Sequence, residues 1–302
     1  MREVPRVSGF TFVRNAVRLR YPVLEAIRSI LPLCDELVVN VGISDDGTLD
    51  LIRTLGRDPR LVVFESRWDE TKLAGGAVLA EQTDLALDRC TGDVCLYVQA
   101  DEALHEDDYP VLRQALVRLH ADPVLEGLLF RYVHFYGSLH TVGRCRRWYR
   151  HEIRAVKNGR GARSWRDAQG FRVGVGKDAR KLRVAHSGAR MFHYGWVRPP
   201  EAQKQKLAEM ERLYHGDAAR RRRLAEGFAY DVGEKVESFT GTHPAVMRDF
   251  VAATDWPFEA HPRHLRLDSL ETAREDLLDL FERATGIRVG EYRNYELVSG
   301  KQ

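Results

Sequence analysis

Short apolar runs alternate with amphipathic helical patterns through roughly the first 135 residues, and this alternation constrains the fold more than any other feature. The runs are rich in β-branched and aromatic residues, which is typical of buried strands. The predicted strands are 7–13, 36–41, 61–66, 94–99 and 125–137, and the predicted helices are 22–31, 48–56, 75–90 and 105–122. Strand–helix alternation with short connections predicts an α/β fold, with a mostly parallel sheet flanked by helices.

The predicted topology also indicates where a ligand binds. In open parallel sheets, ligands lie beyond the carboxyl ends of the strands. Four segments follow strands in this way, at residues 12–15, 41–48, 66–76 and 99–106. We therefore expect the functional site among these loops.

Composition excludes several classes of protein. With 44% hydrophobic residues, the 302-residue chain buries enough apolar surface to fold, which excludes a disordered protein. Its formal net charge of +3 is too small to indicate nucleic acid as the main partner. No apolar run reaches the roughly 18 residues that would cross a bilayer. The first residues lack the apolar segment of a secretory signal, so we expect a cytoplasmic protein, either free or peripheral to a membrane.

The four cysteines point to the same compartment. Cys34, Cys90, Cys95 and Cys145 form no CxxC pair, and all but Cys145 lie in apolar segments. We expect buried free thiols rather than a zinc site or a disulfide framework. Such thiols are typical of a reducing cytoplasm.

The pattern changes twice after the last predicted strand. Residues 138–198 are dense in Arg, Gly, Trp and Tyr and contain only short extended runs, which is typical of loops that build a site. From Pro199 onward the chain is mainly helical. We therefore expect one domain at 1–198 that carries the site and a helical region at 199–302 that covers one side of the site or mediates self-association.

Two acids stand directly after the predicted strand 94–99. Asp101 and Glu102 would lie at the carboxyl edge of the sheet, where carboxylates can hold a hard divalent cation. A solvated turn that caps the next helix is the alternative, and for this segment alone it is the commoner outcome. A second polar loop, Ser44-Asp45-Asp46-Gly47-Thr48, follows the strand 36–41 and reads as a turn that starts a helix.

The order of these motifs resembles the family 2 glycosyltransferases, which have the GT-A (Rossmann-like) fold. Those enzymes carry an S-x-D-G-T loop after the second strand, and a Gly-Asp pair before a strand that ends in an Asp motif. The matching residues are Ser44, Asp46, Gly47, Thr48, Gly92, Asp93, Ala100, Asp101 and Glu102. The resemblance covers residues 6–135 well and continues weakly to about 198.

The resemblance implies a reaction and its reactants. A nucleotide-diphosphate sugar would donate its sugar, with inversion, to an acceptor hydroxyl on a saccharide, a lipid-linked molecule or a small molecule. Mg²⁺ or Mn²⁺ would neutralise the diphosphate. The nucleotide would lie across the ends of the first, second and fourth strands. The residues that this arrangement selects for donor binding are Phe12, Val13, Arg14, Asn15, Asp46, Gln99, Ala100 and Asp101.

Three departures from the family pattern bear on the metal and on the donor. Gln99 stands where the first acid of the Asp-x-Asp motif is expected, so Asp101 would carry most of the metal contact, together with Glu102. Several GT-A enzymes use a late histidine as an extra metal ligand, and His193 could compensate here; the alternative is a packed histidine. Val41 or Gly42 replaces the base-contacting acid, and Thr83-Asp84 replaces the family's Arg-Asn. The resemblance therefore does not identify the donor nucleotide or its sugar.

Further candidates come from two other segments. Lys72 could face a phosphate, and Gly76 beside it permits close backbone approach, although a surface loop is an equal alternative. Near His193, Trp196 and Arg198 are further candidates for donor contact, and Arg198 could instead be exposed.

Asp167 is the candidate general base. It lies between Trp165 and Phe171, and aromatic neighbours suit sugar stacking and raise the proton affinity of a carboxylate. A turn or salt-bridge residue near Arg166 and Arg172 is the alternative.

Two rival functions stay open on the sequence. A nucleotidyltransferase would carry a glycine-rich phosphate loop after the first strand, and residues 11–22 contain no glycine. A catalytically silent relative, which binds nucleotide or scaffolds a complex, agrees with Gln99 and with the missing base-contacting acid. Oligomer formation is open for either function.

Overall fold

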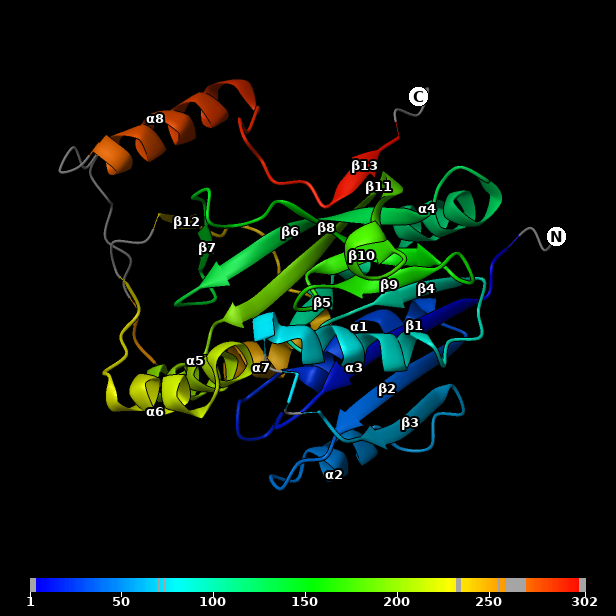
Figure 1. Cartoon of the computed structure of the whole chain (residues 1–302), viewed down its shortest axis with the longest axis horizontal. Helices are drawn as coiled ribbons and strands as arrows, with labels where there is room; N and C mark the ends of the chain where they lie inside the picture. The colour runs from blue at the N-terminus through cyan, green and yellow to red at the C-terminus, as the bar shows by residue number, and fades with distance from the viewer. Residues whose placement is uncertain are drawn as a thin grey trace.

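The computed structural model describes residues 4–69, 71–72, 74–231, 235–254, 256–258 and 270–298. Its centre is a curled sheet with helices on both faces (Figure 1), in the strand order β3-β2-β1-β4-β8-β6-β11-β10-β9. The α/β fold class expected from the sequence is confirmed.

The first four strands of the sheet are parallel, as predicted. They are β1 (Val7–Val13), β2 (Glu36–Gly42), β3 (Leu61–Ser66) and β4 (Val94–Tyr97). β2 and β4 are buried along their whole length, which explains why they read as continuous apolar runs. This half of the sheet brings the ends of β1 and β4 side by side.

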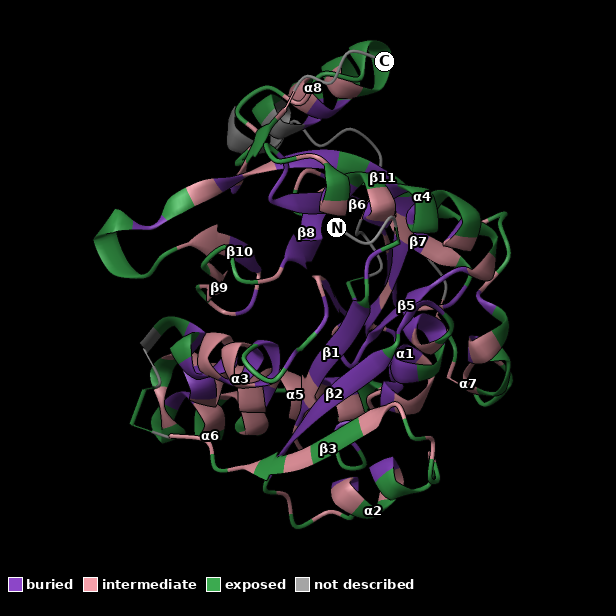
Figure 2. Ribbon diagram, turned by 90° about the vertical axis from the view of Figure 1, so that its right-hand side faces the viewer, coloured by how far each residue is buried: buried purple, intermediate pink, exposed green. Residues whose placement is uncertain are grey.

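Helices cover this parallel half on both faces. They are α1 (Val23–Ile30), α2 (Thr48–Arg53), α3 (Ala77–Leu87) and α4 (Tyr109–Ala121). Figure 2 shows the buried strands β1 and β2 between α3 on one side and α1 on the other. One core joins Ile27, Leu96 and Leu116, and a second joins Phe10 and Ala86 across the opposite face.

The remaining strands make the sheet mixed rather than mostly parallel. β8 (His151–Lys157) lies between β4 and β6 (Gly127–Tyr136) and is antiparallel to both. β10 (Gly170–Val173) and β9 (Ala162–Trp165) add an antiparallel pair at one edge. The sequence of the short extended runs after residue 138 did not predict whether these strands pair in parallel or antiparallel, because the pattern within a strand does not indicate which strand lies next to it.

One long strand organises the site. β11 (Arg180–Trp196) pairs in parallel with β6, with register shifts at His186/Arg190 and His193/Trp196. β5 (Glu102–Leu104) pairs antiparallel with it and sets His193 opposite Glu102. The acids that follow β4 are therefore next to the histidine of the late segment.

The region after residue 198 is mainly helical where it is described, as expected. Its helices are α5 (Pro200–His215), α6 (Asp217–Ala225), α7 (Arg248–Ala252) and α8 (Leu270–Thr285). The short strands β12 (Val236–Ser238) and β13 (Tyr295–Leu297) pair with β7 (Thr141–Gly143) and β11. Single 3₁₀ turns lie at Leu31–Leu33, Ala74–Gly76, Glu106–Asp108, Gly176–Asp178 and Ala245–Met247. The predicted division at residue 198 is thus crossed by strand pairing.

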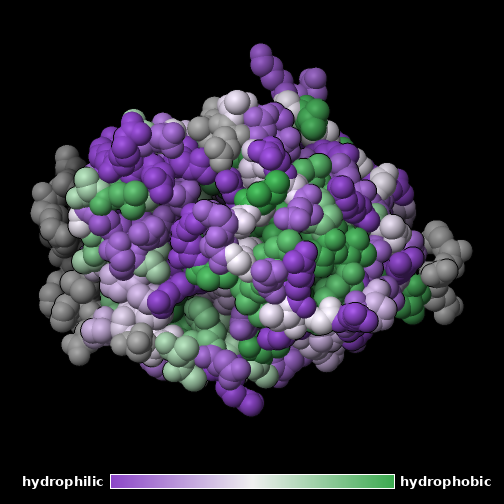
Figure 3. Space-filling model, turned by 90° about the horizontal axis from the view of Figure 1, so that it is seen from below, coloured by the Kyte–Doolittle hydropathy of each residue, from purple (hydrophilic) through white to green (hydrophobic). Residues whose placement is uncertain are grey.

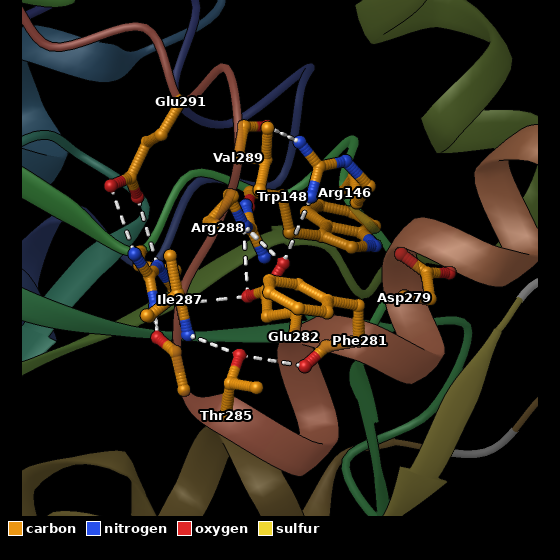
Figure 4. Close-up of polar contacts among 12 residues, drawn as sticks. Arg146, Trp148, Asp279, Phe281, Glu282, Thr285, Ile287, Arg288, Val289 and Glu291 are labelled. Carbon is orange, nitrogen blue, oxygen red and sulfur yellow. Dashed lines mark hydrogen bonds and ion pairs between the residues drawn. The ribbon is translucent and has the colours of Figure 1, made fainter.

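Ion pairs attach the end of the chain to the sheet. Arg288 Nε donates to Glu282 Oε2 at 2.8 Å, and Arg146 Nη1 lies 3.4 Å from the same oxygen (Figure 4). Arg150 binds both carboxylate oxygens of Glu291, each at 2.9 Å. These contacts tie α8 and the segment that follows it to the chain between β7 and β8.

The face that carries β3 and α2 is partly apolar. Figure 3, seen from this side, shows hydrophobic surface gathered among hydrophilic residues. Val62 and Val63 of the edge strand β3 are 43% and 39% exposed.

None of the described helices is long and apolar enough to cross a membrane. All four cysteines are buried and free, as predicted.

Candidate active site

A cavity of about 790 Å³ opens at the carboxyl ends of β1 and β4, beneath α5. Its position agrees with the expectation that ligands bind beyond the strand ends. Its wall carries five arginine or lysine side chains and three carboxylates, so it suits an anionic ligand. These are Arg14, Arg154, Arg166, Lys206, Arg212, Asp101, Asp167 and Glu209.

The end of β1, which the resemblance selects for donor binding, forms one wall. Phe12, Val13, Arg14 and Asn15 all line the cavity. Asn15 has a positive φ of 54°, and its backbone N–H donates to Ser44 Oγ at 3.0 Å, which holds the turn open. The guanidinium of Arg14 lies 5.2 Å from the ring centre of Trp68, another lining residue that the sequence analysis did not single out.

The end of β4 forms the opposite wall. Gln99, Ala100 and Asp101, which the resemblance selects for donor binding, line the cavity. Gln99 Nε2 donates to the backbone oxygen of Ala168 at 3.2 Å. Gln99 therefore ties the end of β4 to the turn that carries Asp167.

Asp101 is buried and surrounded by basic groups. Its Oδ2 accepts a hydrogen bond from Lys206 Nζ at 2.9 Å and lies 3.6 Å from Arg198 Nη2, while His193 Nε2 lies 4.0 Å from Oδ1. Burial opposes ionisation of Asp101, but Lys206, His193 and Arg198 outweigh it and hold the pKa well below its usual value. Asp101 is ionised at neutral pH.

Lys206, on α5, is the functional candidate that sequence reasoning missed. Its Nζ also donates to the backbone oxygen of Gly195 at 2.8 Å. Burial and the nearby Arg198 lower its pKa to about 8, against the attraction of Asp101. From the sequence alone, a lysine on an amphipathic helix is predicted to be exposed at the surface. Only the fold brings Lys206 to Asp101, which lies 105 residues earlier.

His193 is buried beside a second histidine. His134 Nδ1 and His193 Nδ1 lie 2.9 Å apart, so one of the two nitrogens carries the proton between them. Burial lowers the pKa of both imidazoles, and the pKa of His134 lies well below its usual value. Both rings are therefore neutral at pH 7. Gly195 permits this packing, because a Cβ there would lie 2.3 Å from His193 Nε2.

Glu102 is not among the residues that line the cavity. It is fully buried, and Arg154 Nη2 donates to its Oε1 at 2.8 Å while Arg154 Nε donates to its Oε2 at 3.0 Å. Tyr132 and the backbone N–H of Gln99 add donors at 2.5 and 3.0 Å. These contacts occupy both carboxylate oxygens of Glu102, so they position the wall of the cavity and do not leave a metal ligand.

The predicted metal ligands therefore do not fit Mg²⁺ or Mn²⁺. Asp101 already faces two buried cations, and a divalent ion beside it would be repelled by both. Glu102 is held by Arg154, and Gln99 offers an amide in place of an acid. Across the described residues, no three His, Cys, Asp or Glu side chains are grouped so that they could hold a metal ion.

Asp167 lines the cavity in the turn between β9 and β10. Its neighbours Arg166 and Ala168 both have positive φ, 58° and 62°, which non-glycine residues rarely adopt and which often marks functional turns. The hydroxyl of Tyr214 on α5 donates to Asp167 Oδ2. Burial and this contact raise the pKa of Tyr214, so its hydroxyl stays protonated.

The aromatic residues expected beside Asp167 lie elsewhere. Phe171 is buried in the core against Phe10 and Tyr97, and Trp165 stacks on the guanidinium of Arg172 at 3.8 Å. Both directions follow from the antiparallel pairing of β9 and β10. The aromatic wall of the cavity is formed instead by Phe12, Tyr21, Trp68, Tyr149 and Tyr214.

Five other predicted residues are not in the cavity lining. Asp46 accepts from the backbone N–H groups of Arg18 at 2.8 Å and of Thr48 at 3.1 Å, which fixes the start of α2. Lys72 is exposed and pairs with Glu81 at 3.0 Å. Gly76 packs against Asp167 and Tyr214, and Trp196 packs against Tyr136. Arg198 is 1% exposed and lies behind Asp101.

Comparison with known proteins gives a resemblance of fold only. No protein-family model matches the chain, and no curated protein matches its sequence. Similar solved structures include TarS of S. aureus, with 20% identity over 44% of this chain and 23% of that one, at a TM-score of 0.32. Another is a mannosyl-3-phosphoglycerate synthase from Rubrobacter xylanophilus, with 24% identity over 43% of this chain and 41% of that one, at a TM-score of 0.30.

A third similar structure matches over most of the chain. It is the mannosyltransferase PcManGT of Pyrobaculum calidifontis, in complex with GDP-Man and Mn²⁺, with 16% identity over 96% of this chain and 77% of that one, at a TM-score of 0.38. The matches to the first two structures span less than half of those proteins' length. At these TM-scores the function has to be argued from the site itself.

Proposed function

We propose that this chain is a glycosyltransferase that binds a nucleotide-diphosphate sugar in the cavity beneath α5. One observation carries the proposal: a single cavity at the ends of β1 and β4 is lined by several basic side chains and by the carboxylate of Asp167. The basic side chains suit a diphosphate, and the carboxylate suits a general base. The volume of about 790 Å³ is ample for a nucleotide sugar.

The reaction follows as one displacement. The Asp167 carboxylate takes the proton of an acceptor hydroxyl as its oxygen attacks the anomeric carbon of the donor sugar. The bond between that carbon and the diphosphate oxygen breaks, and its electron pair stays on the departing nucleoside diphosphate. Attack from the face opposite the leaving group inverts the anomeric centre. Basic residues of the cavity wall stabilise the negative charge that develops.

Helix α5 closes the side of the cavity that faces Asp167. Lys206, Met210 and Leu213 lie one helical turn apart and all line the cavity. Tyr214 of the same helix reaches Asp167. These contacts support the proposal that the region after residue 198 helps to form the acceptor side of the site.

A catalytically silent nucleotide-binding protein is the second candidate. One observation favours it: the Tyr214 hydroxyl already occupies an oxygen of Asp167, the only proposed base. In that case the cavity would bind a nucleotide sugar without transferring the sugar. Release of nucleoside diphosphate in the presence of acceptors separates the two functions.

The proposal predicts a specific thermal stabilisation. UDP, GDP and their sugars, each at 100 times its dissociation constant, should raise the free energy of unfolding by about 2.7 kcal/mol. The matching nucleosides are tested at the same concentrations. The nucleosides lack the diphosphate and should have a much smaller effect. The measurement is a thermal melt of the full chain with each ligand, followed by an assay for released nucleoside diphosphate.

The matched control is Lys72→Met. Lys72 is exposed and is not among the lining residues, so this variant should respond to each ligand as the unchanged protein does. Equal responses to nucleosides and nucleotide sugars, or no response to any of them, would contradict the proposed donor site.

A further inference from the structure

The carboxylate expected to hold a metal is already neutralised by the protein. Lys206 Nζ lies 2.9 Å from Asp101 Oδ2, and Arg198 Nη2 lies 3.6 Å from the same oxygen. Lys206 and Arg198 therefore place two positive charges beside the one negative charge of Asp101 at this wall. All three charged side chains are nearly buried, with exposed fractions of 12% or less.

From this arrangement we infer that Lys206 supplies the positive charge for the donor diphosphate, so that the chain binds its nucleotide without a divalent cation. The inference rests on the proposed function, because its ligand is the diphosphate of the proposed donor. Lys206 is the residue that contacts the ligand, whereas Asp101 and Arg198 are positioning residues.

The geometry of Lys206 leaves one donor for a ligand. An ammonium group has three N–H bonds. In the part of the chain that the structure describes, Nζ donates to two oxygens, Asp101 Oδ2 at 2.9 Å and Gly195 O at 2.8 Å. Both acceptors hold the ammonium at the cavity wall, which Lys206 lines. Nζ also lies 5.5 Å from the ring centre of Tyr21, another lining residue, and we assign its remaining N–H bond to an anion in the cavity.

Arg198 strengthens this arrangement from behind. It is 1% exposed, and its guanidinium donates to the backbone oxygens of Leu19 at 2.8 Å and of Gly195 at 2.7 Å. Its Nη2 is buried and has no hydrogen-bond partner among the described residues. Since Arg198 is fixed by the backbone and does not line the cavity, it adds positive potential without contacting the ligand.

Lys206 would assist departure of the leaving group through a hydrogen bond. When the bond between the anomeric carbon and oxygen breaks, the electron pair moves onto a diphosphate oxygen. The ammonium N–H donates to that oxygen and keeps its proton, so the nucleoside diphosphate leaves as an anion. The proton of the acceptor hydroxyl goes to Asp167, which balances the step.

The metal account and the lysine account predict opposite results for two variants. If Asp101 bound a metal, Asp101→Asn would abolish nucleotide binding and Lys206→Met would have little effect. On the lysine account, Lys206→Met weakens binding of UDP and GDP about 30-fold, which is the loss of one charge-assisted hydrogen bond. Asp101→Asn removes a negative charge next to the diphosphate, so binding is kept.

The test is a titration calorimetry series with UDP and GDP, in EDTA and again with Mn²⁺ or Mg²⁺. The proteins are the unchanged chain, Lys206→Met, Lys206→Arg, Asp101→Asn and the control Lys72→Met. We expect equal affinity with and without metal, a large loss only in Lys206→Met, and binding close to that of the unchanged chain in Lys206→Arg. Thermal melts without ligand identify any variant that fails to fold. If Lys206→Met fails to fold, the comparison of Lys206→Arg with the unchanged chain still tests the inference.

The outcomes separate this inference from the proposed function. Binding that needs Mn²⁺ or Mg²⁺, or that is lost in Asp101→Asn, would overturn the inference and leave the glycosyltransferase proposal standing. Absence of UDP and GDP binding under both conditions would overturn the proposed function, and the inference with it.

The pH dependence of the same titration gives a further prediction. Lys206 is charged below its pKa of about 8, so metal-free affinity for UDP should be complete at pH 7 and fall above pH 8 toward the roughly 30-fold weaker affinity expected of Lys206→Met. The other groups that face Lys206 do not titrate between pH 7.5 and 9.5. The pKa of Asp101 and of His193 is lowered, and that of Tyr21 is raised. Lys206→Arg should show a flat profile, and a flat profile in the unchanged chain would contradict this role.

Discussion

Replacing Asp167 with asparagine is expected to lower the rate of sugar transfer by a factor of about 100 to 10,000, which is the usual contribution of a general base. The amide has almost the same shape and can still accept a hydrogen bond from the hydroxyl of Tyr214. It cannot take the proton of the acceptor hydroxyl. The loss should therefore appear in kcat, whereas the dissociation constant of the donor stays within about twofold.

Glu209→Gln is the matched control for this experiment. Glu209 also lines the cavity, but its carboxylate is paired with Arg212 at 3.1 Å and with Arg220 at 2.7 Å. We expect the rate of transfer to change by less than about tenfold in this variant, because both carboxylate oxygens of Glu209 are already occupied by guanidinium groups. Full turnover in Asp167→Asn, or an equal loss in Glu209→Gln, would contradict the assignment of Asp167.

The second large effect concerns stability. Arg154→Met should lower the free energy of unfolding by about 3–5 kcal/mol, because it leaves the carboxylate of Glu102 buried without its counter-ion. Arg154 and Glu102 are 1% and 0% exposed, and the guanidinium contacts both carboxylate oxygens. Chemical unfolding of the two proteins measures the difference.

The double variant Glu102→Gln with Arg154→Met tests the cause of that loss. Because it removes both charges, it should be more stable than Arg154→Met alone. If Glu102 instead bound a metal, added Mn²⁺ would stabilise Arg154→Met more than the unchanged chain. That result would contradict the positioning role of Glu102.

The strand ends were predictable from sequence because they depend on local pattern. A parallel strand buried on both faces is a continuous apolar run, so the ends of β1 and β4 could be located within a few residues. Those ends supply Arg14, Asn15, Gln99 and Asp101, all of which line the cavity. Their roles in binding remain proposals.

Side-chain direction and long-range contacts were not predictable in this way. Asp101 and Glu102 are adjacent in sequence, but Asp101 lies in a turn and lines the cavity, whereas Glu102 begins β5 and is held in the interior by Arg154. Lys206 and Arg154 gave no signal in the sequence, since their partners lie 105 and 52 residues away.

The metal expectation shows how a motif can mislead. A carboxylate at a strand end reads as a cation site only when no basic side chain of the same protein reaches it. In this fold, α5 brings Lys206 to Asp101, and the segment after β11 brings Arg198. The donor nucleotide, the acceptor, the cytoplasmic location and any self-association stay predictions.

A crystal structure of the chain with the nucleotide sugar that stabilises it most tests the central claim most directly. We expect the diphosphate in the cavity between the ends of β1 and β4, with an oxygen within hydrogen-bond distance of Lys206 Nζ and the sugar facing Asp167. A nucleotide bound outside this cavity, or a diphosphate remote from Lys206, would contradict the account.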